Sequence, residues 1–200
     1  MTRAGIARVA LCALALAGCA TAPGPVEVTR FHDAAALAQL GQGTIFIEAA
    51  PVEGMSDLEL APYKAAVAAQ LAQLGYQESA RADASHIAQV FLDRFVERAV
   101  DRRGPVSVGV GGSTGGYRSG VGLGVGLNLG GGPKDQIGTQ LAVQIRDKES
   151  NASLWEGRAQ FLVKENSELA QADTNAQTIA AALFRDFPGG NGETVEVGVR

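Results

Sequence analysis

Residues 137–163 read IGTQLAVQIRDKESNASLWEGRAQFLV, and this stretch decides the fold class. From Ile137 to Arg146, residues that suit a buried face alternate with small or polar ones, and the alternation resumes at Leu154 and continues to Val163. A period of two is typical of a strand with one buried face. The polar run 147–153 predicts a turn, so the two segments are expected to pair as an antiparallel hairpin.

The second strand of this hairpin has two different faces. Glu156, Arg158 and Gln160 point one way, and the other face carries Trp155, Gly157, Ala159, Phe161 and Val163. We expect the tryptophan face to pack beneath helices, because large apolar side chains drive burial. The alternative is that Trp155 forms an exposed binding platform.

Outward from the hairpin, the sequence predicts further strands at 26–31 and 44–47. Ser56 and Glu59 have the spacing of a helix capping box, and an apolar stripe follows until Gly75. Pro62 either lies awkwardly inside this helix or marks its true first turn. A closing helix is expected over 171–187. The stretch 86–100 fits both helical and strand spacing.

This order of elements predicts an α+β domain: a mostly antiparallel sheet with two main helices packed on one face and a glycine-rich hairpin. The predicted hairpin spans 104–133, and 13 of the chain's 26 glycines lie between Gly104 and Gly132. Its second arm alternates glycine or asparagine with apolar residues, which form a possible contact arm of Val121, Leu123, Val125, Leu127 and Leu129. Three interpretations remain open: an edge hairpin of the sheet, a strand pair for self-association or docking of an envelope protein, and membrane contact.

The first residues have the three parts of an export signal. Arg3 and Arg8 are positive, an apolar run follows, and Ala17-Gly18 end it with small residues. Leu16-Ala17-Gly18-Cys19 resembles the bacterial lipobox at every position, which implies cleavage before Cys19 and acyl chains on its sulfur. Ala20 lacks the aspartate that favours inner-membrane retention in enteric bacteria. By that resemblance the protein is expected in the cell envelope, anchored by membrane lipid to the outer membrane and facing the periplasm.

Composition argues against several function classes. Removal of residues 1–18 leaves 15 basic and 21 acidic residues, a net charge of −6, which disfavours nucleic-acid binding. Cys12 leaves with the signal, so the remaining domain has no thiol besides Cys19, and two histidines are too few for a three-histidine zinc site. The G-x-S-x-G pattern at 111–115 lacks the helix that a nucleophile elbow requires.

We therefore expect no cofactor, no metal and no catalytic residues: a binding or structural protein rather than an enzyme. Two alternatives remain open. A hydrolase acting on envelope material would gather acids such as Asp93 or Glu97 with others from separate strands. A carrier of a small hydrophobic ligand would enclose an apolar cavity between the sheet and the helix over 60–74.

The chain resembles a family of bacterial lipoproteins known as domain of unknown function 4136. The resemblance covers roughly 26–188 and rests most on Leu154-Trp155-Glu156-Gly157-Arg158-Ala159 and on the ending Leu183-Phe184-Arg185-Asp186-Phe187-Pro188. It implies an envelope α+β domain of unknown biochemistry, favours a strand at 86–100, and supplies no catalytic residues. The expected organisation is a signal peptide (1–18), an acylated cysteine and tether (19–25), the domain (26–188) and a disordered polar tail (189–200).

Overall fold

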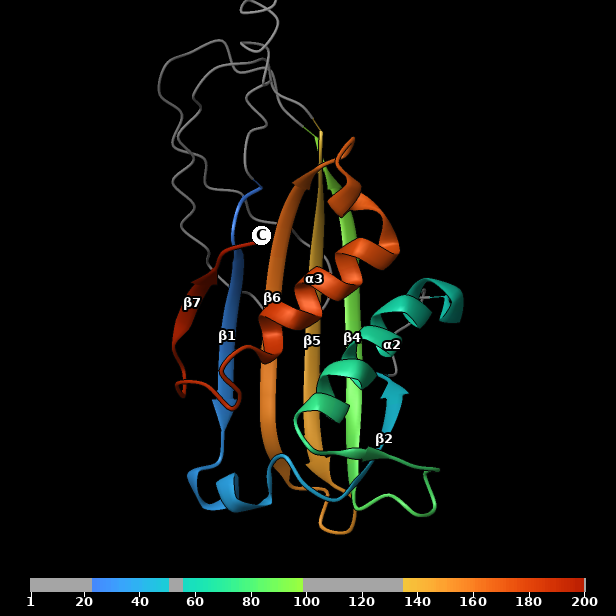
Figure 1. Cartoon of the computed structure of the whole chain (residues 1–200), viewed down its shortest axis with the longest axis vertical. Helices are drawn as coiled ribbons and strands as arrows, with labels where there is room; N and C mark the ends of the chain where they lie inside the picture. Colours follow the sequence, from blue (N-terminus) through green and yellow to red (C-terminus); the bar gives the residue numbers. More distant parts are fainter. Residues whose placement is uncertain (1–22, 51–55, 99–134, 200) are drawn as a thin grey trace, which may run out of the picture.

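The computed structural model describes residues 23–50, 56–98 and 135–199. They form one seven-stranded sheet in the order β3-β2-β4-β5-β6-β1-β7 (Figure 1). The strands are β1 (Val26–His32), β2 (Thr44–Ala49), β3 (Gln77–Glu78), β4 (His86–Glu97), β5 (Gln136–Asp147), β6 (Ser153–Lys164) and β7 (Thr194–Val197). The helices are α2 (Asp57–Gln73) and α3 (Ala172–Phe184), with short 3-10 helices η2 (Ala34–Gln39) and η3 (Glu168–Ala170).

The predicted hairpin at 137–163 is confirmed as β5 and β6. The two strands pair antiparallel, with Leu141 opposite Ala159 and Ile145 opposite Trp155. The register shifts by one residue after Ile145, next to the turn. The alternation was a sufficient signal here, because both strands bury one face only.

The ambiguous stretch at 86–100 contains strand β4. It pairs antiparallel with β5 along its whole length, from His86 opposite Asp147 to Glu97 opposite Gln136. The backbone hydrogen bonds of β4 are made with β5. The local spacing of apolar residues could not reveal this distant pairing, so it left helix and strand equally possible.

The sheet is mostly antiparallel, as expected, but it is mixed rather than purely antiparallel. β2 runs parallel to both β3 and β4, and the remaining neighbours are antiparallel. The physical reason is α2, which crosses between β2 and β4 and returns the chain to the end where β2 began. Such a crossover is what a parallel pair needs. The predicted glycine-rich hairpin at 104–133 lies outside the described residues.

The expectation of a disordered tail is wrong for residues 194–197. They form β7, which pairs antiparallel with β1 and covers its edge, with Val28 opposite Val195. Val197 is buried against the core. A backbone bond from Gly192 to the Arg30 carbonyl (2.7 Å) fixes the turn that brings the strand back.

Both α-helices pack on the same face of the sheet, as predicted (Figure 1). Ser56 caps the start of α2, and its hydroxyl accepts a hydrogen bond from the Glu59 backbone N–H at 3.3 Å. It buries the predicted stripe at Leu60, Tyr63, Val67 and Leu71. Pro62 lies inside α2 rather than at its first residue.

Trp155 faces the core, as the alternation predicts, and Gly157 makes room for it. The indole is fully buried and stacks on Phe184 with ring centroids 5.3 Å apart. A methyl group added at Gly157 would come within 2.2 Å of the indole and 2.8 Å of Leu183. The prediction of a core tryptophan is therefore confirmed, and the exposed binding platform is excluded.

Candidate functional site

The sheet face away from the helices is the candidate functional site, and we refer to it as the open face. Its side chains come from the alternate positions of β2, β4, β5 and β6. Strand register places them in rows, so that Glu48 neighbours Gln89, Gln89 neighbours Gln144, and Gln144 neighbours Glu156. No helix in the described part of the chain packs on these rows (Figure 1).

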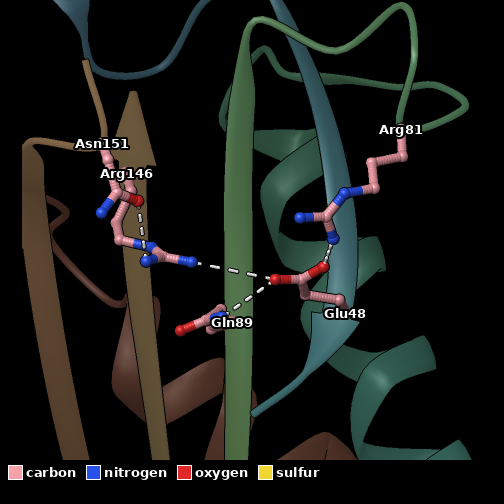
Figure 2. Close-up of polar contacts among 5 residues, drawn as sticks. All are labelled: Glu48, Arg81, Gln89, Arg146 and Asn151. Carbon is pink, nitrogen blue, oxygen red and sulfur yellow. Dashed lines mark hydrogen bonds and ion pairs between the residues drawn. The ribbon is translucent and has the colours of Figure 1, made fainter. Parts of the chain in front are cut away.

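Five polar residues meet at one side of this face and form the Glu48 cluster: Glu48, Arg81, Gln89, Arg146 and Asn151 (Figure 2). The Glu48 carboxylate lies at its centre. It accepts a hydrogen bond from Gln89 Nε2 at 2.9 Å, pairs with Arg81 Nη1, and lies 3.8 Å from Arg146 Nη2. Arg146 Nη1 also donates to Asn151 Oδ1 at 2.9 Å.

The two arginines of the Glu48 cluster differ in exposure. The side chain of Arg146 is 20% exposed, Glu48 is 17% exposed, and Arg81 is 59% exposed. Arg146 Nε is buried and has no hydrogen-bond partner among the described residues. Two guanidinium groups share one carboxylate, so the cluster has a net positive charge and presents Arg81 to solvent. The Glu48–Arg81 pair is partly exposed and is therefore expected to add little to stability.

A shallow groove of about 280 Å³ lies beside the cluster. Ala142 lies at the bottom of the groove, because its side chain is short. The longer side chains that line the groove are Gln89, Gln144, Phe91 and Glu156. The groove thus combines amide donors and acceptors with one ring and one carboxylate, and it can take a protruding side chain of a partner.

Two arginine–phenylalanine pairs flank the open face. The guanidinium of Arg81 lies over the Phe46 ring at 5.8 Å, and that of Arg158 lies over the Phe31 ring at 6.0 Å. Arg158 is held by Glu156, with Nε donating to the carboxylate at 2.8 Å. Arginine and aromatic residues are the types enriched in protein interfaces.

A serine, a histidine and an aspartate also come together, at the entry of β4. Ser85 Oγ lies 3.0 Å from His86 Nδ1, and His86 is opposite Asp147 in the β4–β5 pair. The Ser85 hydroxyl donates to the Thr44 carbonyl at 2.9 Å and accepts from the Thr44 N–H at 3.2 Å. The hydroxyl proton is therefore engaged with backbone, and these residues join β2 to β4 rather than form a nucleophile and base.

Asp147 and His86 each have a local structural role as well. The Asp147 carboxylate accepts hydrogen bonds from Ser150 Oγ at 2.6 Å and Ser150 N at 2.7 Å. These bonds hold the pKa of Asp147 below its ordinary value of 3.8. The His86 ring is buried and packs edge-on against Tyr76, with centroids 5.7 Å apart.

The acids named for a hydrolase are not gathered from separate strands. Asp93 and Glu97 both lie on β4, where they face Gln140 and Gln136 of β5. Within the described ranges, no three His, Cys, Asp or Glu side chains are placed to hold a metal ion. The region proposed for a carrier's cavity is occupied by buried side chains of α2, which belong to the same core cluster as the sheet.

The residues predicted to make contacts lie outside the described residues. These are Cys19 and the arm of Val121, Leu123, Val125, Leu127 and Leu129. The Glu48 cluster was not predicted. Outward alternation in β2 and β5 places Glu48 and Arg146 on a polar face, but only the register brings β2 and β5 to either side of β4. Among the helices of the described residues, none is long and apolar enough to span a membrane.

Comparisons with known proteins identify a family and a fold. A family model described as "Domain of unknown function (DUF4136)" matches residues 30–189. The uncharacterized protein ZMO1243 of Zymomonas mobilis subsp. mobilis is 33% identical over 63 residues, which cover 32% of this chain. The match spans only 24% of that protein's length.

Two solved structures are among those that match this chain. A PDZ domain protein from Parabacteroides distasonis has a TM-score of 0.50 and 13% identity, over 87% of this chain and 39% of that one. The PelC dodecamer from Paraburkholderia phytofirmans has a TM-score of 0.43 and 12% identity, over 80% of this chain and 94% of that one. At such identities the similarity concerns the fold alone.

Proposed function

The chain belongs to the family described as domain of unknown function (DUF4136), and from this premise we propose that it is a lipid-anchored envelope protein whose folded domain is a binding module. The observation that carries the proposal is the open face. One side of the sheet is buried under α2 and α3, while the other presents the Glu48 cluster, a groove and two arginine–phenylalanine pairs. The proposed activity is recognition rather than catalysis.

The anchor is proposed from sequence. Leu16-Ala17-Gly18-Cys19 ends an apolar run that is preceded by basic residues. Acylation of Cys19 would attach the domain to membrane lipid. Two or more acyl chains make such attachment stable, since each buried methylene contributes about 0.8 kcal/mol. The proposed location is the outer membrane, facing the periplasm.

The proposed partner is an envelope protein with acidic and apolar side chains. Arg81 offers donors to a carboxylate, and the groove over Ala142 accepts a side chain. The arginine–phenylalanine pairs resemble the anchor residues of protein interfaces, and the net charge of the exported chain disfavours nucleic acid.

The glycine-rich segment is proposed as a second contact, for self-association or for an envelope partner, through Val121, Leu123, Val125, Leu127 and Leu129. Support comes from its position in the chain. Glu97 and Gln136 flank the segment and are paired on neighbouring strands, so it departs from and returns to one end of the sheet. The segment can therefore meet a partner without being part of the strand pairing that holds β4 and β5.

Site-specific photo-cross-linking tests the binding module. A photoreactive residue replaces Gln144 on the open face, and the matched control replaces Gln73 on the exposed side of α2. We expect Gln144 to give a discrete protein adduct in intact cells, and Gln73 to give none. The adduct should be lost when Arg81→Glu reverses the charge beside the groove. Equal labelling from both positions, or none, contradicts the proposal.

The anchor has its own test. Mass spectrometry and membrane fractionation compare the native chain with Cys19→Ser. We expect an acylated amino-terminal cysteine in the membrane fraction, and a soluble, unacylated protein in the variant. A soluble native protein without acyl groups contradicts the proposed anchor and leaves the open face as a separate question.

A further inference from the structure

The chain enters the sheet at one end, close to β6. A methyl group added at Gly24 would lie 4.0 Å from the carbonyl oxygen of Leu162, so Gly24 is a neighbour of the end of β6. Gly24 is five positions after Cys19, and an extended chain covers at most about 3.6 Å per position. Cys19 therefore stays within about 18 Å of Gly24 and within roughly 25 Å of Leu162.

The Glu48 cluster lies toward the opposite end of the same strands. Arg146 is paired with Ser153, and Leu162 is nine positions further along β6 than Ser153. At about 3.3 Å per residue, this distance is roughly 30 Å. In Figure 1 the start of β1 and the ends of β4 and β6 lie together, and the turn between β5 and β6 lies at the far end.

The side chains at the entry end suit an uncharged contact. Val96 is 54% exposed and Leu162 is 36% exposed. Among the described residues near these strand ends, the charges nearly balance, since Arg98 and Lys164 accompany Glu97, Asp135 and Glu165. Little electrostatic attraction to anionic lipid is expected, so the tether and the two apolar side chains determine the contact.

We infer that the entry end of the sheet, carrying Val96 and Leu162, rests against the phospholipid bilayer. This inference rests on the proposed acylation of Cys19. The strands are then oriented away from the lipid surface. The Glu48 cluster lies roughly 30 Å further from the bilayer than Leu162. The partner of the open face must reach the domain at that distance from the bilayer.

Quenching by lipid tests this orientation on the full acylated chain. The exported chain has no cysteine besides Cys19, so a single added cysteine takes a fluorophore specifically. Leu162→Cys labels the entry end, and Leu37→Cys is the matched control on η2, which Figure 1 shows at the far end. Leu37 is 42% exposed, close to the exposure of Leu162. The vesicles contain phosphatidylethanolamine and phosphatidylglycerol, with a quencher on the lipid headgroup.

We expect severalfold stronger quenching at position 162 than at position 37, with little change on addition of salt. Equal quenching, or stronger quenching at 37, overturns the orientation. A third label at Gln144 tests whether the domain lies flat on its open face, because Gln144 pairs with Glu156, roughly 20 Å along β6 from Leu162. Quenching there as strong as at 162 also overturns the orientation. The mass of the acyl group is measured first. Its absence overturns the proposed anchor and the orientation together, whereas an acylated protein without the gradient overturns the orientation alone.

Discussion

Arg30 shows how one charged side chain can link a strand to a helix. It is 5% exposed, and its Nε donates to the Leu183 carbonyl at 2.9 Å while Nη2 donates to the Ala182 carbonyl at 3.1 Å. These carbonyls are at the end of α3, where the helix leaves acceptors unpaired and the macrodipole is negative. Burial lowers the pKa of Arg30, and the nearby Asp186 carboxylate opposes that shift. The guanidinium thus ties β1 to α3.

Replacement of Arg30 should therefore cost considerable stability. We expect Arg30→Ala to lower the free energy of unfolding by about 3 kcal/mol, because two carbonyls lose charged donors and a buried side chain is removed. Arg30→Lys keeps the charge but not the forked geometry, and should recover only part of the loss. Urea denaturation measures both. Equal stability of the native chain and Arg30→Ala would show that the helix end is satisfied by other groups.

Asp147 predicts a measurable pH dependence. Hydrogen bonds from Ser150 lower its pKa in the folded state, so the ionised carboxylate stabilises the fold above its ordinary pKa of 3.8. This contribution is lost as the pH falls through the lowered value. Asp147→Asn removes the ionisation, so the variant should be less stable than the native chain at neutral pH. The two should converge as the pH falls below the ordinary pKa of 3.8 and through the lowered value. Thermal unfolding at a series of pH values tests this, and a constant difference at all pH values contradicts it.

At the scale of elements, one buried polar contact joins the two helices. The Tyr63 hydroxyl on α2 donates to Asn175 Oδ1 on α3 at 2.9 Å, and Asn175 Nδ2 donates to the Leu169 carbonyl at 2.9 Å. Asn175 is fully buried. Burial raises the pKa of Tyr63 above 10, so the phenol stays a neutral donor at physiological pH. The contact fixes how the two helices meet above the sheet.

A double-mutant cycle should reveal this coupling. Tyr63→Phe leaves Asn175 Oδ1 without its donor and should cost about 1–2 kcal/mol, and Asn175→Ala should cost at least as much. The double variant should lose less than the sum of the two, since each single change already breaks the same bond. Urea denaturation provides the three values. Strict additivity would show that the two side chains do not stabilise each other.

Elements that depend on neighbouring residues could be predicted from the sequence. Strands β5 and β6 follow from alternation, the start of α2 from Ser56 and Glu59, and the buried face of Trp155 from its period of two. Elements that depend on distant pairing could not. The parallel course of β2 requires knowing where α2 returns the chain, and β7 is four residues long with a weak pattern of its own. It is a strand because β1 offers a free edge. Glu48 and Arg146 meet for the same reason, through register across three strands.

At the scale of the whole molecule, the proposed lipid anchor and the proposed recognition surface lie toward opposite ends of the sheet. At the entry end, Gly24 neighbours Leu162 and Glu97 pairs with Gln136. The far end carries the turn with Asn151, which contacts Arg146 of the Glu48 cluster. The proposed anchor and the proposed recognition surface are thus separated along the strands, so binding at one need not disturb the other.

This separation predicts that the glycine-rich segment can be removed without unfolding the domain. Deletion of 104–132 leaves 98–103 and 133–135 to join Glu97 to Gln136, which are already paired on adjacent strands. The loop becomes about fourfold shorter, which should raise stability by about 1 kcal/mol through loop-closure entropy. Circular dichroism should show an unchanged fold and an equal or higher melting temperature, with acylation and the Gln144 cross-link retained. A domain that unfolds on deletion would place the segment within the core packing and contradict its role as a separate contact.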